Sequence, residues 1–281
     1  MSVDHHPDAA PTAIAVTIAG SDSGGGAGIQ ADLKTFSALG VYGASVIAAL
    51  TAQNTRGVTG IHDVPPSFVT AQIDAVFSDF AVTAVKIGML SHPDVIAAVA
   101  DGLDKYRQER VVLDPVMVAT SGDRLLVPEA IEVLRTLLIP KAMVITPNLP
   151  EAAALLETAM AQNETEMQEQ GERLLALGPK AVLMKGGHGS GAESVDLLIE
   201  PHAVARLAAE RIDTQNTHGT GCTLSSAIAA GLAKDLPLAE AVREAKAYVT
   251  AAIKASDRLT IGQGHGPVHH FHHWWGEGKS Q

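Results

Sequence analysis

The chain has 281 residues, a length that one large α/β domain can use in full. Apolar residues make up 46% of it, which excludes a disordered chain, and because only 4% are aromatic the core must be built mainly from Ala, Val, Ile and Leu. The formal net charge of −11 argues against nucleic acid as the main partner, since no basic face is left to neutralise phosphates. Any phosphate group must therefore be bound locally, by a few placed cations and backbone amides.

Cysteine content and terminal composition indicate the compartment. The one cysteine, Cys222, allows no intrachain disulfide, which is typical of a reducing compartment. The polar N-terminal residues do not resemble a signal peptide, and no apolar run approaches the roughly 20 residues that cross a bilayer. We expect a cytoplasmic protein with no membrane partner.

Apolar runs of strand length alternate with segments of helical period from residue 13 almost to the end of the chain. Strands are expected at Ala13–Ala19, Ala44–Leu50, Ala84–Met89, Val111–Val116, Met143–Thr146, Ala181–Lys185, Val195–Ile199 and, less regularly, Leu207–Ile212. Helices are expected at Ile29–Leu39, Pro66–Ser78, Pro93–Tyr106, Pro128–Leu138, Leu149–Glu157, Thr165–Leu177, Gly221–Lys234 and Leu238–Ser256. Proline at several helix starts and glycine after several helix ends support these boundaries.

The alternation predicts a three-layer α/β/α domain with a mostly parallel central sheet, because continuously apolar strands are typical of strands buried on both faces. We expect a flexible leader at residues 1–12, one domain over 13–275 that includes the His- and Trp-rich tail, and a flexible end at 276–281. Ligands of such sheets bind at the carboxyl ends of the strands, where the motifs described next fall.

A glycine-rich segment, Gly20–Gly28, joins the first strand to the first helix. It is not a Walker A loop, since no Gly-Lys-Ser/Thr follows. The stretch Gly26–Ala31 matches the dinucleotide pattern, but no acidic residue stands about 20 positions later, where Leu50–Gln53 is found, so a dehydrogenase is disfavoured. The segment either seats a small ring against its backbone or forms a tight turn without a ligand.

A second glycine-rich turn, Gly219-Thr220-Gly221-Cys222, opens an alanine-rich helix. The unsatisfied amides of a helix start bind anions, and residues without side chains let a phosphoryl group approach them. Such an anion hole suits phosphoryl transfer, which needs charge stabilisation more than covalent chemistry. At this helix start we expect Cys222 to have a thiol pKa below about 8.5 and to accept the proton of an attacking hydroxyl. The alternative is a buried structural cysteine.

The span Ala13–Trp275 resembles the hydroxymethylpyrimidine/phosphomethylpyrimidine kinases of thiamine biosynthesis, in the ribokinase-like superfamily. The motifs that carry the resemblance are Ile18–Thr35, Lys86–Leu90, Val112–Met117, Thr146–Glu151, Leu183–His188 and Asn216–Leu224. The resemblance implies ATP- and Mg²⁺-dependent phosphorylation of 4-amino-5-hydroxymethyl-2-methylpyrimidine, then of its monophosphate, by a homodimer. Many superfamily kinases carry Asp where this chain has Cys222. The Cys is found in this branch and in some pyridoxal kinases, and since a thiolate is a weak proton acceptor it leaves the base open.

For the nucleotide and the metal, the resemblance implies roles for residues at three strand ends. Asn148 and Glu151 form the Asn-x-x-Glu motif that organises Mg²⁺, and Asp114 is placed with them as a metal ligand. The alternative role of Asn148 and Glu151 is helix capping, and both roles can hold together. Lys185 and Thr217 are placed with the nucleotide phosphates; the alternative for Lys185 is a solvated lysine that ends a strand.

For the acceptor, Gln53 is the residue that would read an aminopyrimidine, because its amide can pair with an exocyclic amine and the adjacent ring nitrogen. The resemblance adds a set of residues that line the ring pocket, namely Gly20, Ala27, Asp32, Met89 and Val116. The segment Met117–Leu125 is expected to be a lid that excludes water.

Two matters stay open at the level of sequence. The tail His269–Trp275 is expected to be packed or to lie at an interface, with metal binding as the alternative. The functional alternatives are a pyridoxal or pyridoxine kinase with the same chemistry on another ring, and a non-catalytic protein that senses pyrimidines or nucleotides.

Overall fold

The structure is a computed structural model that describes residues 11–117, 127–187 and 191–276. Most of the expected leader, most of the expected lid and nearly all of the expected flexible end therefore lie outside the described residues. Within those ranges no helix is both long and apolar enough to cross a bilayer.

The strands of the described chain form one nine-stranded sheet in the order β3-β2-β1-β4-β5-β6-β7-β8-β9. Their bounds are β1 Ile14–Asp22, β2 Tyr42–Asn54, β3 Gly57–Asp63, β4 Ala84–Ile87, β5 Val111–Leu113, β6 Val144–Ile145, β7 Val182–Lys185, β8 Glu193–Glu200 and β9 Ala203–Glu210. The strands from β2 through β1 to β7 pair in parallel, while β3, β8 and β9 pair antiparallel at the two edges. The prediction of a mostly parallel sheet is confirmed.

The antiparallel edges are where the sequence-based assignment was weakest. The assignment missed β3 entirely, because β3 is largely exposed and lacks the apolar run of a buried strand. The segment expected at Leu207–Ile212 overlaps the end of β9, which begins four residues earlier. The first four residues of β9 are exposed, and the last four alternate between half-buried and exposed. An edge strand with one solvated face gives a weaker pattern than a central strand.

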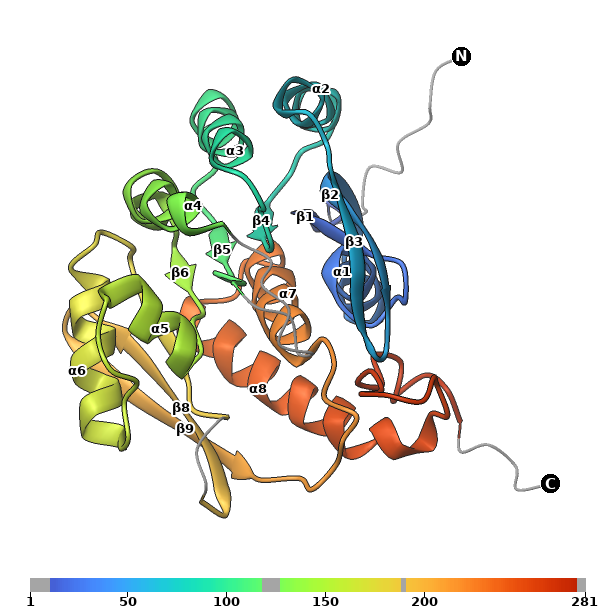
Figure 1. Cartoon of the computed structure of the whole chain (residues 1–281), viewed down its shortest axis with the longest axis vertical. Coiled ribbons are helices and arrows are strands. Elements are labelled where there is room, and N and C mark those ends of the chain that lie inside the picture. The colour runs from blue at the N-terminus through green and yellow to red at the C-terminus, as the bar shows by residue number, and fades with distance from the viewer. Residues whose placement is uncertain (1–10, 118–126, 188–190, 277–281) are drawn as a thin grey trace.

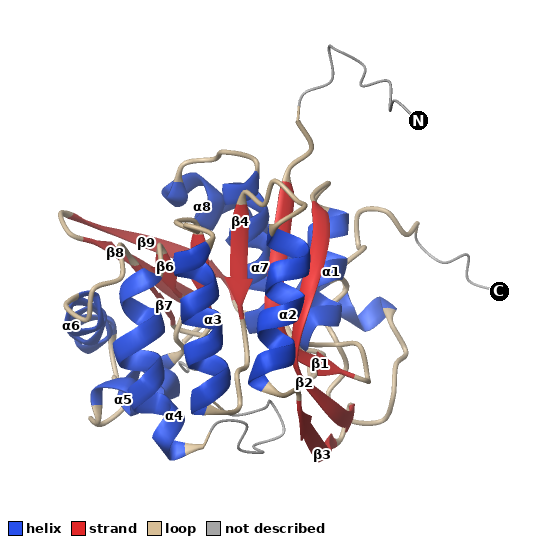
Figure 2. Ribbon diagram, turned by 90° about the horizontal axis from the view of Figure 1, so that it is seen from above, coloured by secondary structure: helices blue, strands red, loops and turns tan. Residues whose placement is uncertain are grey.

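Helices cover both faces of the sheet, as Figures 1 and 2 show. Their bounds are α1 Gly28–Ala38, α2 Pro66–Phe77, α3 Pro93–Lys105, α4 Pro128–Val133, α5 Leu149–Leu156, α6 Glu164–Leu175, α7 Thr220–Ala233 and α8 Leu238–Lys254. Buried residues of α2 to α6 form one apolar cluster with one face of the sheet, and buried residues of α1, α7 and α8 form a second with the other face. The predicted three layers are confirmed. The helix expected at Pro128–Leu138 is instead α4 followed by a π turn at Leu134–Leu138.

The His- and Trp-rich tail packs on the second helix layer. The hydroxyl of Tyr248 in α8 donates to the backbone oxygen of His270 at 2.7 Å, and the indole of Trp274 donates to the oxygen of Ala38 in α1 at 3.1 Å. The His270 ring contacts the Thr223 hydroxyl in α7 at 3.1 Å, and burial lowers the pKa of His270 to about 3. The tail thus joins the ends of three helices.

Candidate active site

A cavity of about 820 Å³ lies at the carboxyl ends of the parallel strands, against the start of α7. It is lined by the glycine-rich loop after β1, the end of β2, the segments after β4 and β5, the start of α5, the end of β7 and the turn before α7. The structure brings fourteen of the expected site residues to this cavity: Gly20, Ala27, Gln53, Met89, Asp114, Val116, Asn148, Glu151, Lys185, Thr217, Gly219, Thr220, Gly221 and Cys222.

Asp32 is the exception, and its expected place in the pocket lining is wrong. It is fully buried and does not line the cavity. The Lys86 ammonium donates to both oxygens of the Asp32 carboxylate at 2.9 Å. The hydroxyls of Thr17 and Ser226 also donate to this carboxylate, each at 2.6 Å. Asp32 therefore ties α1, β1, β4 and α7 together beneath the site, and Lys86 is the member of this cluster that lines the cavity.

Lys86 was missed by the sequence analysis, although a lysine inside an apolar strand is itself a signal. Its side chain has no exposed surface. Burial opposes its charge, but Asp32, Cys222 and Asp114 outweigh that cost and hold the pKa of Lys86 above its usual value. Lys86 therefore stays protonated at the floor of the site, as a buried ion pair with Asp32.

The turn before α7 has the geometry that its glycines predict. Gly219 is the N-cap of α7, with a φ of 80° that favours glycine, and it lies directly against the backbone of Gly26. Gly221 faces the polar side of the cavity, since a Cβ there would lie 3.3 Å from Lys185 Nζ and 3.5 Å from an Asp114 oxygen. A side chain at Gly221 would fill the space between the turn and these two charges.

Thr220 differs from its neighbours because both of its polar groups are used inside the turn. Its amide and its hydroxyl donate to the oxygen of Thr217, at 3.2 and 2.7 Å. The amides of Gly221 and Cys222, in the first turn of α7, have no acceptor among the described residues. The amide of Gly219 likewise has no acceptor there, so the candidate anion hole comprises the amides of Gly219, Gly221 and Cys222 and excludes that of Thr220, a distinction that the sequence could not make.

The expectation of a lowered Cys222 pKa is wrong. Burial raises the pKa of the thiol to about 11, and the lowering effects of Lys86 and of the Gly28 backbone amide do not compensate, partly because Asp32 and Asp114 act against them. A helix N-terminus favours a thiolate, but the desolvation of the thiol outweighs it here. Cys222 is consequently almost wholly protonated at neutral pH.

Lys185 lies between two acidic groups on the other side of the turn. Its ammonium is 2.9 Å from an Asp114 oxygen and 3.7 Å from Glu151 Oε2. Burial opposes ionisation of Asp114, but Lys185 and Lys86 outweigh it, so the pKa of Asp114 lies below its usual value. Burial raises the pKa of Glu151 to about 7, because Lys185 only partly offsets it and Asp114 adds repulsion. One lysine therefore does not neutralise this pair fully.

Asn148 and Glu151 form a capping box at the start of α5. The Glu151 amide donates to Asn148 Oδ1 and the Asn148 amide donates to Glu151 Oε2, both at 2.8 Å. Glu151 also lines the cavity, and its Oε1 has no hydrogen-bond partner among the described residues. The capping alternative is thus realised, and one carboxylate oxygen is still left for a cation.

The residues present fit a hydrated divalent cation that takes further ligands from a nucleotide. Asp114 and Glu151 carry negative charge that Lys185 does not cancel, and Mg²⁺ needs few carboxylates when phosphates and waters complete its shell. No cluster of three or more His, Cys, Asp or Glu that could hold a metal occurs in the described part of the chain. The donor set suits a cation that arrives with phosphate rather than a permanent metal centre.

The lining of the cavity extends to α8 and β9, where the sequence analysis assigned no residue. Val249 and Ile253, one helical turn apart on α8, give it apolar surface there, beside the polar Lys246 and Thr250. Apolar side chains with a few polar groups among them suit a flat base. The spacing of Val249 and Ile253 was visible in the sequence, but the same spacing also marks an ordinary core-facing helix.

The fold and the site together define a class of protein: a small-molecule kinase with a three-layer, ribokinase-like fold. Buried cations, free amides at a helix start and acidic groups meet at one end of a parallel sheet, and an amide side chain faces them across the cavity. Comparison with known proteins identifies the family within this class.

The family model described as phosphomethylpyrimidine kinase matches residues 22–269. The chain is 64% identical over 264 residues to the hydroxymethylpyrimidine/phosphomethylpyrimidine kinase of Rhizobium meliloti (strain 1021), covering 94% of this chain and 99% of that protein. It resembles the solved phosphomethylpyrimidine kinase of Clostridium difficile 630 with a TM-score of 0.76 and 49% identity, over 85% of this chain and 99% of that one. It also resembles an ADP complex of Bacillus subtilis pyridoxal kinase, with a TM-score of 0.86 and 38% identity, over 92% and 98%.

The chain belongs to the phosphomethylpyrimidine kinase family. The family resemblance, the ribokinase-like fold and the phosphotransferase class expected from the sequence are all confirmed.

Proposed function

We propose that this protein transfers the terminal phosphoryl group of ATP to the hydroxymethyl group of 4-amino-5-hydroxymethyl-2-methylpyrimidine, and then phosphorylates the monophosphate to the diphosphate. The observation that carries the proposal is the position of Gly221, which lies against Lys185 and Asp114 in the cavity that Gln53 also lines. One cavity thus contains a turn that could bind the transferring phosphoryl group, a lysine that could bind the phosphates of the nucleotide, and a glutamine that could bind the acceptor ring.

On the donor side, Lys185 would bind the phosphate oxygens of the nucleotide, while Val249 and Ile253 on α8 would contact the base. The ADP complex of the similar Bacillus subtilis pyridoxal kinase supports a nucleotide in this fold. Asp114, Glu151 and Asn148 would hold Mg²⁺ through their oxygens and its waters, with Thr217 beside the phosphates. When bound, the cation would neutralise charge on the transferring group.

On the acceptor side, the ring would lie between Gln53 and the apolar Met89 and Val116. The amide of Gly20 donates to the oxygen of Met89 at 3.1 Å, and the two residues are in contact, so this wall of the pocket is fixed. Ala27 and Gly20 would offer backbone rather than side chains to the ring.

At the reacting end, the free amides of Gly221 and Cys222 would bind the phosphoryl oxygens, and the thiolate form of Cys222 would accept the hydroxyl proton and become the neutral thiol. With a pKa of about 11 the thiolate is a minor form at neutral pH, but a loose transition state requires proton transfer only late in the reaction. The ammonium of Lys86 would stabilise the thiolate before it takes up the proton.

Phosphate analysis of the purified protein with ATP, Mg²⁺ and the aminopyrimidine tests the proposal. We expect ³¹P NMR to show the monophosphate first and the diphosphate later, with matching ADP. Pyridoxal is the comparison substrate, since similar solved structures include pyridoxal kinases. A kcat/KM for pyridoxal above that for the pyrimidine would reassign the substrate, and no ADP with either ring would indicate a sensing protein.

A cytoplasmic location and a homodimer remain predictions. The single Cys222 supports a reducing compartment, and exposed aromatic side chains at Tyr42, Phe68 and Trp274 offer apolar surface for a second copy. Sedimentation at micromolar concentration checks the dimer.

A further inference from the structure

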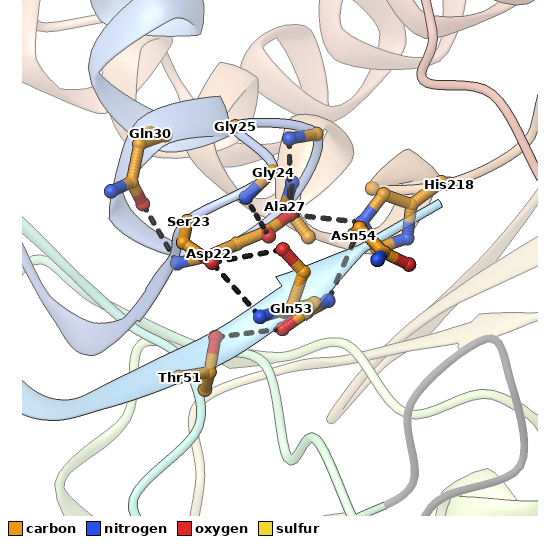
Figure 3. Close-up of polar contacts among 12 residues, drawn as sticks. Asp22, Ser23, Gly24, Gly25, Ala27, Gln30, Thr51, Gln53, Asn54 and His218 are labelled. Carbon is orange, nitrogen blue, oxygen red and sulfur yellow. Dashed lines mark hydrogen bonds and ion pairs between the residues drawn. The ribbon is translucent and has the colours of Figure 1, made fainter. Parts of the chain in front are cut away.

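Asp22 and His218 form a buried pair between the acceptor pocket and the turn before α7 (Figure 3). Asp22 Oδ1 accepts from the amide of Gly24 at 2.8 Å, and Oδ2 accepts from the amides of Gly26 and Ala27 at 3.0 and 2.8 Å. Oδ2 also lies 2.9 Å from His218 Nε2. Burial raises the pKa of Asp22, but its hydrogen bonds from His218 and the backbone outweigh this effect and lower it, so the group is a carboxylate. A carboxylate only accepts, so His218 Nε2 must carry a hydrogen.

The backbone of Gln53, which pairs with Val58 of β3, is also bound by the Ser23 side chain. The Gln53 amide donates to Ser23 Oγ and the Ser23 hydroxyl donates to the Gln53 oxygen, both at 2.8 Å. Its side-chain carboxamide then reaches between two polar groups: Thr51 Oγ1, 3.0 Å from Oε1, and His218 Nε2, 3.5 Å from Nε2. A half-turn of the carboxamide exchanges its oxygen and its nitrogen, so the chemistry of these two neighbours decides between the two orientations.

Both neighbours select the exchanged orientation. The one hydrogen of the Thr51 hydroxyl is donated to the backbone oxygen of Ser21 at 2.8 Å, which itself can only accept. Thr51 Oγ1 therefore offers Gln53 a lone pair. His218 Nε2 donates its one hydrogen to Asp22 Oδ2 and so has no lone pair that could accept from the Gln53 NH₂ group. We propose that the Gln53 carboxamide donates its NH₂ to Thr51 and turns its oxygen toward the His218 N–H, and that Asp22 and His218 thereby set which way round the acceptor ring binds.

The consequence for the ring follows from connectivity and rests on the proposed function. The carboxamide can then form one hydrogen bond to the ring from each of its two polar atoms. Its oxygen, on the His218 side, would accept from the exocyclic amine. Its NH₂ group, on the Thr51 side, would donate to the ring nitrogen. In the proposed substrate the amine lies between that ring nitrogen and the carbon that bears the hydroxymethyl group. The hydroxymethyl group is then directed to the His218 side, where Gly219 begins the phosphoryl turn. The opposite orientation would direct it away from the turn.

His218 and Thr51 are thus positioning residues for the known class of reaction, and neither was assigned a role from the sequence. His218 is next to the Gly219 turn in the chain, so one residue couples ring orientation to the phosphoryl site. Asp22 fixes the donor nitrogen of His218 and at the same time fixes the glycine-rich loop over which the ring would lie.

A direct test measures the orientation of the carboxamide in the unliganded wild-type protein. The side-chain NH₂ signals of Gln53, assigned by their loss in Gln53→Glu, should show nuclear Overhauser contacts to the Thr51 methyl group. Contacts to the ring hydrogens of His218 without contacts to Thr51 would overturn the proposal. This measurement does not require turnover, so its result does not depend on whether the proposed function is correct.

A second test compares substrates in two variants. Wild-type kcat/KM should fall by about 10- to 100-fold for the analogue that lacks the amine and for the analogue in which CH replaces the ring nitrogen beside the amine. His218→Phe should reduce the amine discrimination about tenfold and leave the KM for ATP unchanged. Thr51→Val should instead reduce the discrimination at the ring nitrogen, and Thr51→Ser, which keeps the hydroxyl, should restore it. Equal amine discrimination in wild type and His218→Phe would overturn the proposal. No phosphorylation of the pyrimidine by wild type would overturn the proposed function alone.

Discussion

The two sides of the cavity are built on different physics. On the proposed acceptor side, the charge of Asp22 is stabilised by three backbone amides and one imidazole, and the side chain that lines the cavity there is the neutral carboxamide of Gln53. On the phosphate side, the Lys185 ammonium lies within 4 Å of both Asp114 and Glu151, and its charge does not fully balance theirs. Neutral hydrogen bonds fix the orientation of a flat ring, whereas residual charge attracts a charged, hydrated nucleotide. The free amides of Gly221 and Cys222 lie where the two sides meet.

Gly221→Val should have the largest effect, because it places a branched side chain between the turn and Lys185. The Cβ alone would lie 3.3 Å from Lys185 Nζ, and loss of a site for the transferring group costs about 1000-fold or more in kcat, beyond one lost donor. Steady-state kinetics measure it. Gly60→Ala, where a Cβ meets only the Ala52 methyl group at 3.7 Å, is the matched control and should keep wild-type rates. Equal activity of the Gly221→Val and Gly60→Ala variants would show that the turn before α7 does not take part in phosphoryl transfer.

Cys222→Ala should lower kcat by about 100-fold if its sulfur accepts the hydroxyl proton. Because the pKa of Cys222 is raised to about 11, the thiolate fraction grows tenfold per unit of pH below that value, so wild-type kcat should rise from pH 7 to pH 9. The variant should lose that slope. A fall of less than tenfold with an unchanged pH profile would assign the step to the amides and to positioning.

The unbalanced charge of the phosphate side should appear as a pH dependence of stability. Glu151, with a folded pKa raised from 4.5 to about 7, holds its proton longer in the folded state, so this residue makes the protein less stable as pH rises from about 4.5 to 7. The free energy of unfolding relative to Glu151→Gln should drop by on the order of 2 to 3 kcal/mol across that window. Urea denaturation without nucleotide or Mg²⁺ measures it, and the variant keeps an oxygen for the capping box. A constant difference would mean that Lys185 neutralises the pair.

Thr220→Val should have the smallest effect on kcat, and so distinguish the structural role of Thr220 from the role of the free amides in the same turn. The Thr220 hydroxyl donates to the Thr217 oxygen at 2.7 Å and so is not free for a phosphoryl group. We expect kcat to change by less than tenfold, with a stability loss of about 1 kcal/mol. A loss comparable to that of Gly221→Val would show that the hydroxyl turns to the phosphoryl group during transfer.

The amino-acid sequence by itself determined the parallel centre of the sheet, the helices on both faces and the segments that meet at the site. Continuous apolar strands and capped helices are local patterns, and the carboxyl ends of parallel strands must share one edge. It also indicated Asn148 and Glu151, whose capping box is a local interaction. The exposed β3 was not found, because edge strands lack the buried pattern.

Only the tertiary structure decided which polar groups are free and which charges are balanced. Asp32 lies buried beneath the site, where it binds Lys86 and Ser226. These partners lie far from Asp32 in the sequence, so no local pattern could show its position. The Cys222 pKa rises because burial, which depends on every element around the cavity, outweighs the local helix start. The pairing of Asp22 with His218 joins residues 196 positions apart, so no local pattern could have revealed it. Desolvation and pairing between distant residues exist only in the folded molecule. They determine the protonation states and the free polar groups of the site, whereas the sequence motifs indicate only where the site lies.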